Sequence, residues 1–236
     1  MRTDARRLAV LEAMGVDVYR LRRAVRPTPG PAEEAEAGAA PLPAPADDTS
    51  RLDWPALEAA VARCTRCPLH ATRTQTVFGV GRRDADWMVI GEAPGAEEDR
   101  RGEPFVGRAG QLLDQMLCAV GLGRDTVFIA NVLKCRPPGN RDPSAVEAQA
   151  CRGFLDRQIA LVAPRLILAV GRVAAQHLLG TDAPLGRLRG RVHLLADTEI
   201  PVIVTYHPAY LLRTPGQKRQ AWADLCLARR VARGEA

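Results

Sequence analysis

The sequence predicts an α/β fold in which helices cover both faces of a central parallel sheet. Four short, strongly apolar runs alternate along the chain with longer segments whose apolar residues recur every three or four positions. The first pattern is typical of buried strands and the second of amphipathic helices. Strands that alternate with helices pair in parallel, because each helix returns the chain to the edge where the previous strand began.

The expected strands are apolar enough to be buried on both faces. They comprise residues 87–90, 127–130, 166–170 and 201–205. Ligand sites in parallel sheets gather at the carboxyl ends of the strands. Polar or glycine-rich segments follow all four runs, and they begin at Gly91, Asn131, Gly171 and Tyr206. The functional site is therefore expected at this edge of the sheet.

The expected helices show apolar residues at helical spacing. The pattern at residues 109–120 is amphipathic and ends at Gly121. The full set lies near residues 54–63, 109–120, 144–162, 172–179 and 217–232.

Three segments of the chain differ in composition. Residues 1–26 hold seven arginines and three acids, with apolar residues at helical spacing, which predicts a basic amphipathic helix. Residues 27–50 contain six prolines, seven alanines, five acids and no base, which predicts a disordered Pro/Ala-rich linker. Residues 51–236 are expected to form the folded domain. The helix would dock on this domain, bind a partner or contact DNA.

The folded segment is basic, with 26 Lys and Arg against 19 Asp and Glu. This balance suits a polyanionic partner such as nucleic acid, although only two lysines occur and a general preference for arginine would also explain it. No apolar run approaches the length of a membrane span, and residues 1–26 are too charged for a signal peptide. We expect a cytoplasmic monomer without a membrane partner.

Four of the six cysteines are spaced as ligands of one centre. They form a C-x2-C pair and a C-x15-C pair, and they are Cys64, Cys67, Cys135 and Cys151. Four soft thiolates hold either tetrahedral zinc or an iron–sulfur cluster, and spacing alone does not separate the two. Disulfides are disfavoured, because the chain has no secretory signal and is large enough to fold without them.

The other two cysteines, Cys118 and Cys226, lie in helical patterns and are predicted to be small core residues. The histidines His70, His177 and His193 are interpreted as structural.

Two loops at the expected site carry unusual residues. The first leaves a strand through Gly-Glu-Ala-Pro-Gly at residues 91–95, which exposes backbone N–H groups and acidic side chains. It lacks the Gly-Lys-Ser/Thr of a phosphate-binding loop and would also suit an ordinary strand-to-helix turn. The second contains Phe105 between proline and glycine residues. Phe105 would either stack on a planar ring such as a base or anchor the loop.

Two polar residues at strand ends suit recognition of a pyrimidine. Asn131 presents a donor and an acceptor side by side, which complements N3–H and O4 of uracil and mismatches the reverse pattern of cytosine. His207 offers a neutral or protonated imidazole to stabilise charge on a departing group. Leu211 and Arg213 follow it as an apolar wedge and a phosphate-binding cation for an extruded nucleotide, or as part of a capping turn with leucines in the core.

Together these motifs resemble the family-4 uracil-DNA glycosylases, the iron–sulfur members of their superfamily. The resemblance covers about residues 52–230 and depends on the order of its motifs. These are Cys64-x2-Cys67, Gly-Glu-Ala-Pro-Gly with Glu97-Glu98-Asp99, Pro-Phe-Val-Gly-Arg-Ala-Gly-Gln-Leu-Leu at 104–113, Asn-Val-Leu-Lys-Cys-Arg-Pro-Pro at 131–138, Cys151, and His-Pro-Ala-Tyr-Leu-Leu-Arg at 207–213.

The resemblance implies a three-layer α/β/α sandwich with a central four-stranded parallel sheet, and a structural [4Fe–4S] cluster on the four cysteines. It implies hydrolysis of the N-glycosidic bond of uracil in single- or double-stranded DNA, which leaves free uracil and an abasic site. The implied roles are stacking on the flipped uracil by Phe105, reading of its Watson–Crick edge by Asn131, stabilisation of the uracil anion by His207, filling of the vacated stack by Leu211, and exclusion of the thymine methyl by Glu98.

One departure from the wider superfamily concerns the activation of water. Other classes carry an Asp where this chain has Ala93 in the expected pocket, and some carry a Tyr where it has Gly95. Glu92 is the nearest candidate for a general base. A strongly dissociative reaction needs only weak activation of water, because an oxocarbenium-like sugar is already electrophilic.

Two alternatives belong to other functional classes. A non-catalytic iron–sulfur protein that senses DNA damage or redox state would share the fold, but it would not need Phe105, Asn131 and His207. A zinc-bound nucleic-acid-binding module would need only the cysteines. A brown colour in the pure protein would exclude the zinc alternative.

Overall fold

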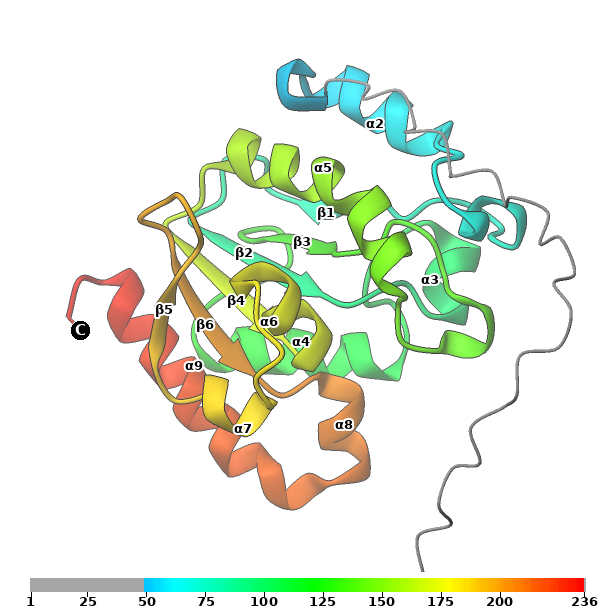
Figure 1. Ribbon diagram of the computed structural model, residues 1–236. Coiled ribbons are helices and arrows are strands. Elements are labelled where there is room, and N and C mark those ends of the chain that lie inside the picture. The colour runs from blue at the N-terminus through cyan, green and yellow to red at the C-terminus, as the bar shows by residue number, and fades with distance from the viewer. Residues whose placement is uncertain (1–48, 236) are drawn as a thin grey trace, which may run out of the picture. The chain divides into compact units, whose positions relative to one another are not determined.

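The computed structural model describes residues 49–235, which lie within one compact unit (Figure 1). The predicted helix at residues 1–26 lies outside the described residues. So does the predicted linker at residues 27–50, except for its last two residues.

Six strands of the described chain form one sheet in the order β1-β3-β2-β4-β6-β5 (Figure 1). The four inner strands pair in parallel. The inner strands are β2 (Trp87–Gly91), β3 (Phe128–Asn131), β4 (Leu166–Val170) and β6 (Pro201–Thr205). The four predicted strands and their parallel arrangement are therefore confirmed.

The two edge strands are additional to the prediction, and both pair antiparallel to their neighbours. β1 (Val80–Gly81) is only two residues long. β5 (Val192–Leu194) exposes its two apolar side chains to solvent. Neither strand gives the continuous apolar run that marks a buried strand in a sequence.

The helices begin where the sequence supplies partners for their first N–H groups. Asp53 accepts a hydrogen bond from the backbone of Ala56, and Ser144 and Glu147 form a capping box at the start of the longest helix. The described helices are α2 (Trp54–Ala62), α3 (Ala96–Arg101), α4 (Arg108–Ala119), α5 (Ala145–Val162), α6 (Arg172–Leu179), α7 (Leu185–Leu188), α8 (Pro208–Arg213) and α9 (Lys218–Ala232), with 3-10 turns at Thr49–Arg51, Pro68–Ala71, Pro138–Asn140 and Pro215–Gln217.

The five predicted helices are confirmed as α2, α4, α5, α6 and α9. The other three helices, α3, α7 and α8, have six residues or fewer, which is too short to show helical periodicity. Within residues 49–235, no helix is long and apolar enough to cross a membrane.

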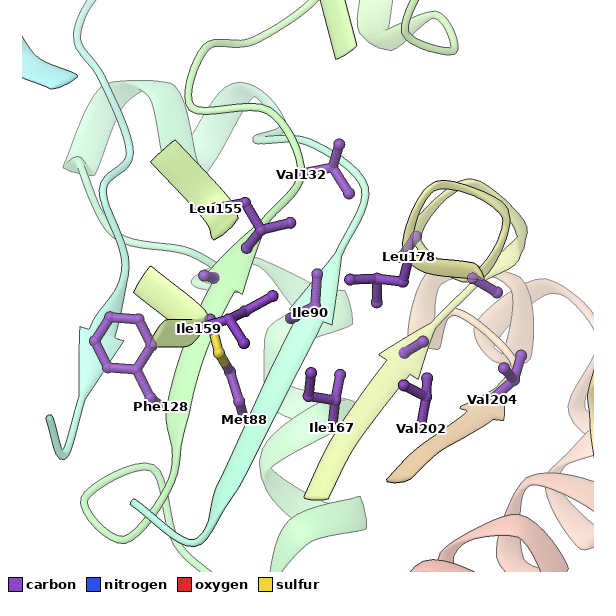
Figure 2. Packing of buried hydrophobic residues seen from close by; sticks show 14 of the residues in the cluster. Met88, Ile90, Phe128, Val132, Leu155, Ile159, Ile167, Leu178, Val202 and Val204 are labelled. Atoms are coloured by element: carbon purple, nitrogen blue, oxygen red, sulfur yellow. The ribbon is translucent and has the colours of Figure 1, made fainter. Parts of the chain in front are cut away.

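Alternate residues of the inner strands face opposite sides of the sheet and build two apolar cores. On one side Met88 of β2 belongs to a cluster with Leu155 of α5 and Leu178 of α6 (Figure 2). On the other side Val89 belongs to a cluster with residues of α4 and α9, such as Leu113. Helices thus cover both faces of the sheet (Figure 1). The α/β/α sandwich is confirmed, and its sheet contains the four predicted parallel strands plus two edges.

One prediction about the core is wrong, since Cys118 is exposed. Helix α4 buries Leu113 and Leu117, and position 118 lies about 100° around the helix from its neighbour. Cys226 of α9 is partly buried.

The sheet places the ends of its inner strands at one edge. The register of β2 and β3 sets Gly91 directly beside Asn131. Strand β2 lies between β3 and β4. After β2 the chain forms β3 on one side of it, and it later crosses over to form β4 on the other side. Open parallel sheets form a ligand-binding crevice at such a switch point.

Candidate active site

A pocket of about 430 Å³ lies at this edge of the sheet. Its walls come from the loop after β2, the loop before α4, the end of β3 and helix α8. The residues predicted from the sequence that line it are Glu92, Ala93, Glu98, Phe105, Asn131, His207 and Arg213. The fold therefore brings these widely separated side chains to one place.

Asn131 and Phe105 approach the same point beside Gly91. Asn131 is 2% exposed, and within the described residues its Oδ1 atom has no hydrogen-bond partner. A Cβ atom on Gly91 would overlap Asn131 Oδ1 and lie 2.6 Å from Cζ of Phe105. Only glycine therefore leaves room for both side chains. A buried acceptor without a partner is costly unless a ligand supplies a donor.

His207 faces the same space as a neutral imidazole. Its ring lies 5.6 Å from that of Phe105, centroid to centroid, at an interplanar angle of 29°. Its Nδ1 accepts a hydrogen bond from the backbone N–H of Ala209, 3.1 Å away, so the ring proton resides on Nε2. Burial, assisted by the charge of Arg213 and opposed by Glu98, lowers the pKa of His207 to about 4. The residue is therefore uncharged near neutral pH and offers Nε2–H as a donor.

Glu98 joins the two loops that form the pocket wall. Its Oε2 accepts from the backbone N–H of Gly95 at 3.1 Å, and its Oε1 accepts from those of Val106 and Gly107 at 3.0 and 3.3 Å. These bonds fix the loop after β2 relative to the segment that follows Phe105. The sequence did not indicate this function, because the partners are backbone groups. Exclusion of a methyl group by Glu98 stays a prediction.

Glu92 lines the pocket with a carboxyl group whose pKa is raised. Burial raises its pKa to about 7, Asp142 adds to this effect, and Arg172 opposes it. Arg172 also forms an ion pair with Asp142. A carboxyl group with a pKa near neutrality is suited to accept a proton from water. Ala93, the next residue, contributes only a methyl group to the pocket wall.

The burial of Leu211 supports the alternative interpretation of this turn, with a leucine in the core, and its role as a wedge stays a prediction. Leu211 is 1% exposed and packs in the core against α4 and α9, because it lies on the inward face of α8. The next residue, Leu212, is 37% exposed. Arg213 is exposed and lines the pocket. Leu212 and Arg213 are thus the side chains at the end of α8 that reach the surface.

The four predicted ligand cysteines converge on one apolar cluster. Cys67, Cys135 and Cys151 are buried in it, and Cys64 packs against it. The sulfur atom of Cys135 accepts a hydrogen bond from the guanidinium of Arg73 at 3.1 Å. Folding thus gathers both pairs, as the prediction requires.

Burial raises the pKa of the Cys151 thiol to about 12 and also raises those of Cys67 and Cys135. Thiols bind metals as thiolates, so a bound cation would have to stabilise their negative charge. This set of soft donors, with nearby N–H groups, fits a thiolate-bound metal group. Within residues 49–235, no set of three or more Cys, His, Asp or Glu side chains is arranged to hold a metal ion. The [4Fe–4S] cluster therefore stays a prediction.

Lys134 connects the cysteine cluster to the pocket. Its side chain is buried, and Nζ donates to the backbone oxygen of Asn131 at 2.8 Å and to Oε1 of Gln158 at 2.6 Å. Its own backbone N–H donates to the sulfur of Cys151 at 3.4 Å. The sequence did not indicate this connection, because no pattern distinguishes a buried lysine from one at the surface.

The segment after Cys135 adds pocket residues that the sequence did not single out. Arg141 lines the pocket and holds the buried carboxylate of Glu147 through two hydrogen bonds of 2.8 and 2.6 Å. The turn that presents it could have been recognised from Pro-Pro-Gly-Asn at residues 137–140. The further lining residues from this segment are Pro137, Asn140 and Asp142, and Tyr210 of α8 also lines the pocket.

A family model described as the uracil DNA glycosylase superfamily matches residues 78–228. The chain belongs to this superfamily. The matched segment contains every pocket residue named above, together with Cys135 and Cys151. It begins after Cys64 and Cys67.

Within the superfamily, the chain is similar to several proteins named type-4 uracil-DNA glycosylase. The one from Archaeoglobus fulgidus is 42% identical over 170 residues, which cover 70% of this chain and 85% of that protein. The one from Pyrobaculum aerophilum is 41% identical over 182 residues, or 75% and 93% of the two chains. The one from Thermotoga maritima is 45% identical over 155 residues, or 65% and 80%. The resemblance to family 4 inferred from the motifs is confirmed.

Proposed function

We propose that this protein is a DNA repair glycosylase that flips uracil out of DNA and hydrolyses its N-glycosidic bond, leaving free uracil and an abasic site. The observation that carries the proposal is the unpaired, buried Oδ1 of Asn131 in a pocket that also presents an aromatic ring and a neutral imidazole. The type-4 relatives bear this activity in their names.

The pocket offers a partner for each feature of the uracil ring. Oδ1 of Asn131 would accept from N3–H, the amide nitrogen would donate to O4, and Phe105 would stack on the ring face. Cytosine carries no hydrogen at N3 and presents an amino group at position 4, so both hydrogen bonds would be lost. Asn131 is thus the proposed discriminator between the two pyrimidines.

Thymine differs from uracil only by a methyl group at C5, and we assign its exclusion to Glu98. The carboxylate accepts three backbone hydrogen bonds, so a methyl group could displace it only by breaking them. In this proposal Glu98 excludes the methyl group because it is a fixed part of the pocket wall.

In the proposed reaction the bond between N1 of uracil and C1′ of the sugar breaks, and uracil leaves with the electron pair. Negative charge develops on O2, where Nε2–H of His207 would stabilise it by a hydrogen bond. Water then adds to C1′ of the oxocarbenium-like sugar, and the carboxylate of Glu92 accepts the proton that this water loses. Because the sugar is already electrophilic, Glu92 needs to act only weakly.

The proposed partner is uracil-containing DNA, single- or double-stranded, bound by a monomer. Arg213 would contact a phosphate at the mouth of the pocket. Of the two leucines of α8, Leu212 is the one available to fill the vacated base stack, and Leu211 could do so only if α8 moved.

We assign a [4Fe–4S] cluster to Cys64, Cys67, Cys135 and Cys151. Such a cluster supplies covalent links among distant segments of the chain and takes no part in the hydrolysis. Residues 51–236 are proposed as the glycosylase domain. Residues 1–26 and 27–50 are proposed as an accessory helix and its linker.

A non-catalytic iron–sulfur sensor is not favoured, because it would not need an aromatic ring, an unpaired amide and a neutral imidazole in one pocket. The deciding experiment is a single-turnover assay on single-stranded U, U·G and U·A oligonucleotides, with T·G as the control. Release of uracil from the first three and no release of thymine is expected. A cofactor-loaded protein that binds these DNAs and releases no base would sink the proposal.

A further inference from the structure

Arg124 lies outside the pocket, in the loop between α4 and β3, yet its guanidinium holds the segment that carries Phe105. One terminal nitrogen donates to the carbonyl of Pro104 at 2.7 Å, and the other donates to the carbonyl of Phe105 at 3.1 Å. The second nitrogen also pairs with Asp114 of α4 at 3.1 Å. Arg124 thus links the loop before β3 to helix α4 and to the carbonyls of Pro104 and Phe105, which precede that helix.

The backbone at Phe105 needs such support. Its φ angle is +54°, in the left-handed region that bulky residues rarely adopt. A Cβ atom on Gly110 would overlap the carbonyl of Phe105, so the first turn of α4 presses directly on this peptide. A strained conformation persists only where the surroundings determine it from several sides.

The opposite side of the same peptide segment is held by Glu98. Its carboxylate accepts from the N–H groups of Val106 and Gly107, which follow Phe105 directly. Arg124 therefore fixes the carbonyls up to Phe105, and Glu98 fixes the N–H groups after it. With both ends of this segment held, the ring of Phe105 lies against His207 and beside the Asn131 amide.

We propose that Arg124 is a positioning residue for uracil excision, which acts by aiming the ring of Phe105; this inference rests on the proposed function. A guanidinium offers several donors in one plane and so bonds two carbonyls and a carboxylate together. Lysine carries the same charge on a single nitrogen and would not hold all three in this geometry.

The test combines substitutions at positions 124 and 105 in the full-length, cofactor-loaded protein. Arg124→Lys should slow single-turnover excision from U·G DNA by about tenfold and Arg124→Ala by about 100-fold, the loss expected from a misplacement of about 1 Å. In a Phe105→Ala background, either change should cost less than about twofold more, because Arg124 acts through the ring. Affinity for abasic-site DNA should stay within about twofold of the parent.

Amide hydrogen exchange gives a second readout that does not depend on activity. The N–H groups of Val106 and Gly107 should exchange at least about tenfold faster in Arg124→Lys, while the core strands keep their protection. Asp114→Asn weakens the ion pair that supports the guanidinium of Arg124. It should also speed exchange at Val106 and Gly107, but by a smaller factor. Arg82→Ala removes an exposed ion pair with Asp84 and serves as the matched control, with no change expected in rate or exchange.

Two results would overturn the inference. One is a full multiplicative loss of rate when the Arg124 and Phe105 substitutions are combined, which would mean that Arg124 does not act through the ring. The other is unchanged exchange at Val106 and Gly107 in Arg124→Lys. A parent protein that releases no uracil would refute the proposed function instead, and the exchange experiment would still decide whether Arg124 holds the loop.

Discussion

The base pocket and the cysteine cluster are separated by only the few residues between Asn131 and Cys135, yet they are built in opposite ways. The pocket combines apolar and polar side chains, and polar groups such as Glu98 and the His207 ring are held by the protein's own hydrogen bonds. The cysteine cluster is apolar, and burial raises the pKa of the thiols of Cys67, Cys135 and Cys151.

This difference indicates that the two regions obtain their geometry from different interactions. The pocket takes its geometry from contacts inside the chain, whereas the cysteines would take their charge and final arrangement from what they bind. Among the described residues, Lys134 links the two regions by hydrogen bonds to Asn131 and Cys151. Substitutions in the pocket should therefore affect rate with little change in stability, and substitutions of the cysteines should affect stability first.

The largest expected effect tests the independence of the pocket. His207→Ala removes the donor to the leaving uracil and should slow single-turnover excision by about 10²–10³-fold, as for loss of one preorganised donor to an oxyanion. Visible absorbance and melting temperature should stay close to those of the parent. His193→Ala, at a histidine bonded to Leu188 away from the pocket, is the control. Loss of the visible absorbance in His207→Ala would show that the two regions are not independent.

The second prediction tests the cysteine side. Cys151→Ala should abolish the visible absorbance and bound iron and lower the melting temperature by several degrees, because the link between distant segments is lost. Cys118→Ala, at the exposed cysteine of α4, is the matched control and should keep both. Metal analysis of the parent that finds zinc without iron would contradict the cluster.

The third prediction concerns the charge of the pocket at different pH. Glu92 accepts a proton only as a carboxylate, and its pKa is about 7, so the rate should rise about tenfold between pH 6 and pH 8. His207, with a pKa of about 4, stays neutral throughout this range. Glu92→Gln should give a lower rate that no longer changes over the interval. A parent profile that is flat from pH 6 to pH 8 would remove Glu92 as the base.

The smallest expected effect is at Glu147, which supports the pocket through Arg141 and caps the helix that carries Cys151. The hydrogen bond from Arg141 lowers the pKa of Glu147 to about 2 against the effect of burial, and Ser144 assists. Its contribution to stability is therefore complete above the unfolded-state pKa of about 4.5 and is lost as pH falls toward 2.

At pH 7, Glu147→Gln should cost about 1–2 kcal/mol, or a few degrees in melting temperature. The difference in melting temperature between the parent and Glu147→Gln should narrow as the pH falls from about 5 to 2. Glu58→Gln, at an exposed ion pair with Arg83, is the control and should shift the melting temperature by less than about one degree. A difference in melting temperature that stays constant with pH would mean that the charge of the Glu147 carboxylate does not contribute to stability.

The sequence predicted the inner strands, because residues buried on both faces leave continuous apolar runs such as 166–170. It missed β5, whose Val192 and Leu194 are exposed, and it missed helices shorter than two turns. It also placed Cys118 in the core, because an amphipathic pattern indicates a helix more reliably than it assigns a residue at the margin of the buried face.

The candidate site was predictable where function resides in a side chain at a strand end, as for Asn131 and His207. It was not predictable where function resides in bonds to the backbone. The carboxylate of Glu98 and the guanidinium of Arg124 bind N–H and carbonyl groups that every residue carries, so no residue pattern marks them. The burial of Leu211 beside an exposed Leu212 likewise depends on which face of α8 packs inward, and one and a half turns of helix leave that undecided in a sequence.

The order of strands in the sheet has a consequence for biosynthesis. Strand β6 is the last parallel strand to leave the ribosome, and His207 lies two residues after its end. A nascent chain that has emerged only as far as β4 contains Phe105 and Asn131 but lacks the imidazole proposed to stabilise the leaving base. Folding during synthesis begins from the N-terminus, and β6 joins the sheet only beside β4. An incomplete chain can therefore form part of the pocket without the proposed excision chemistry, and the protein would become competent to release uracil only once its C-terminal segment has been made.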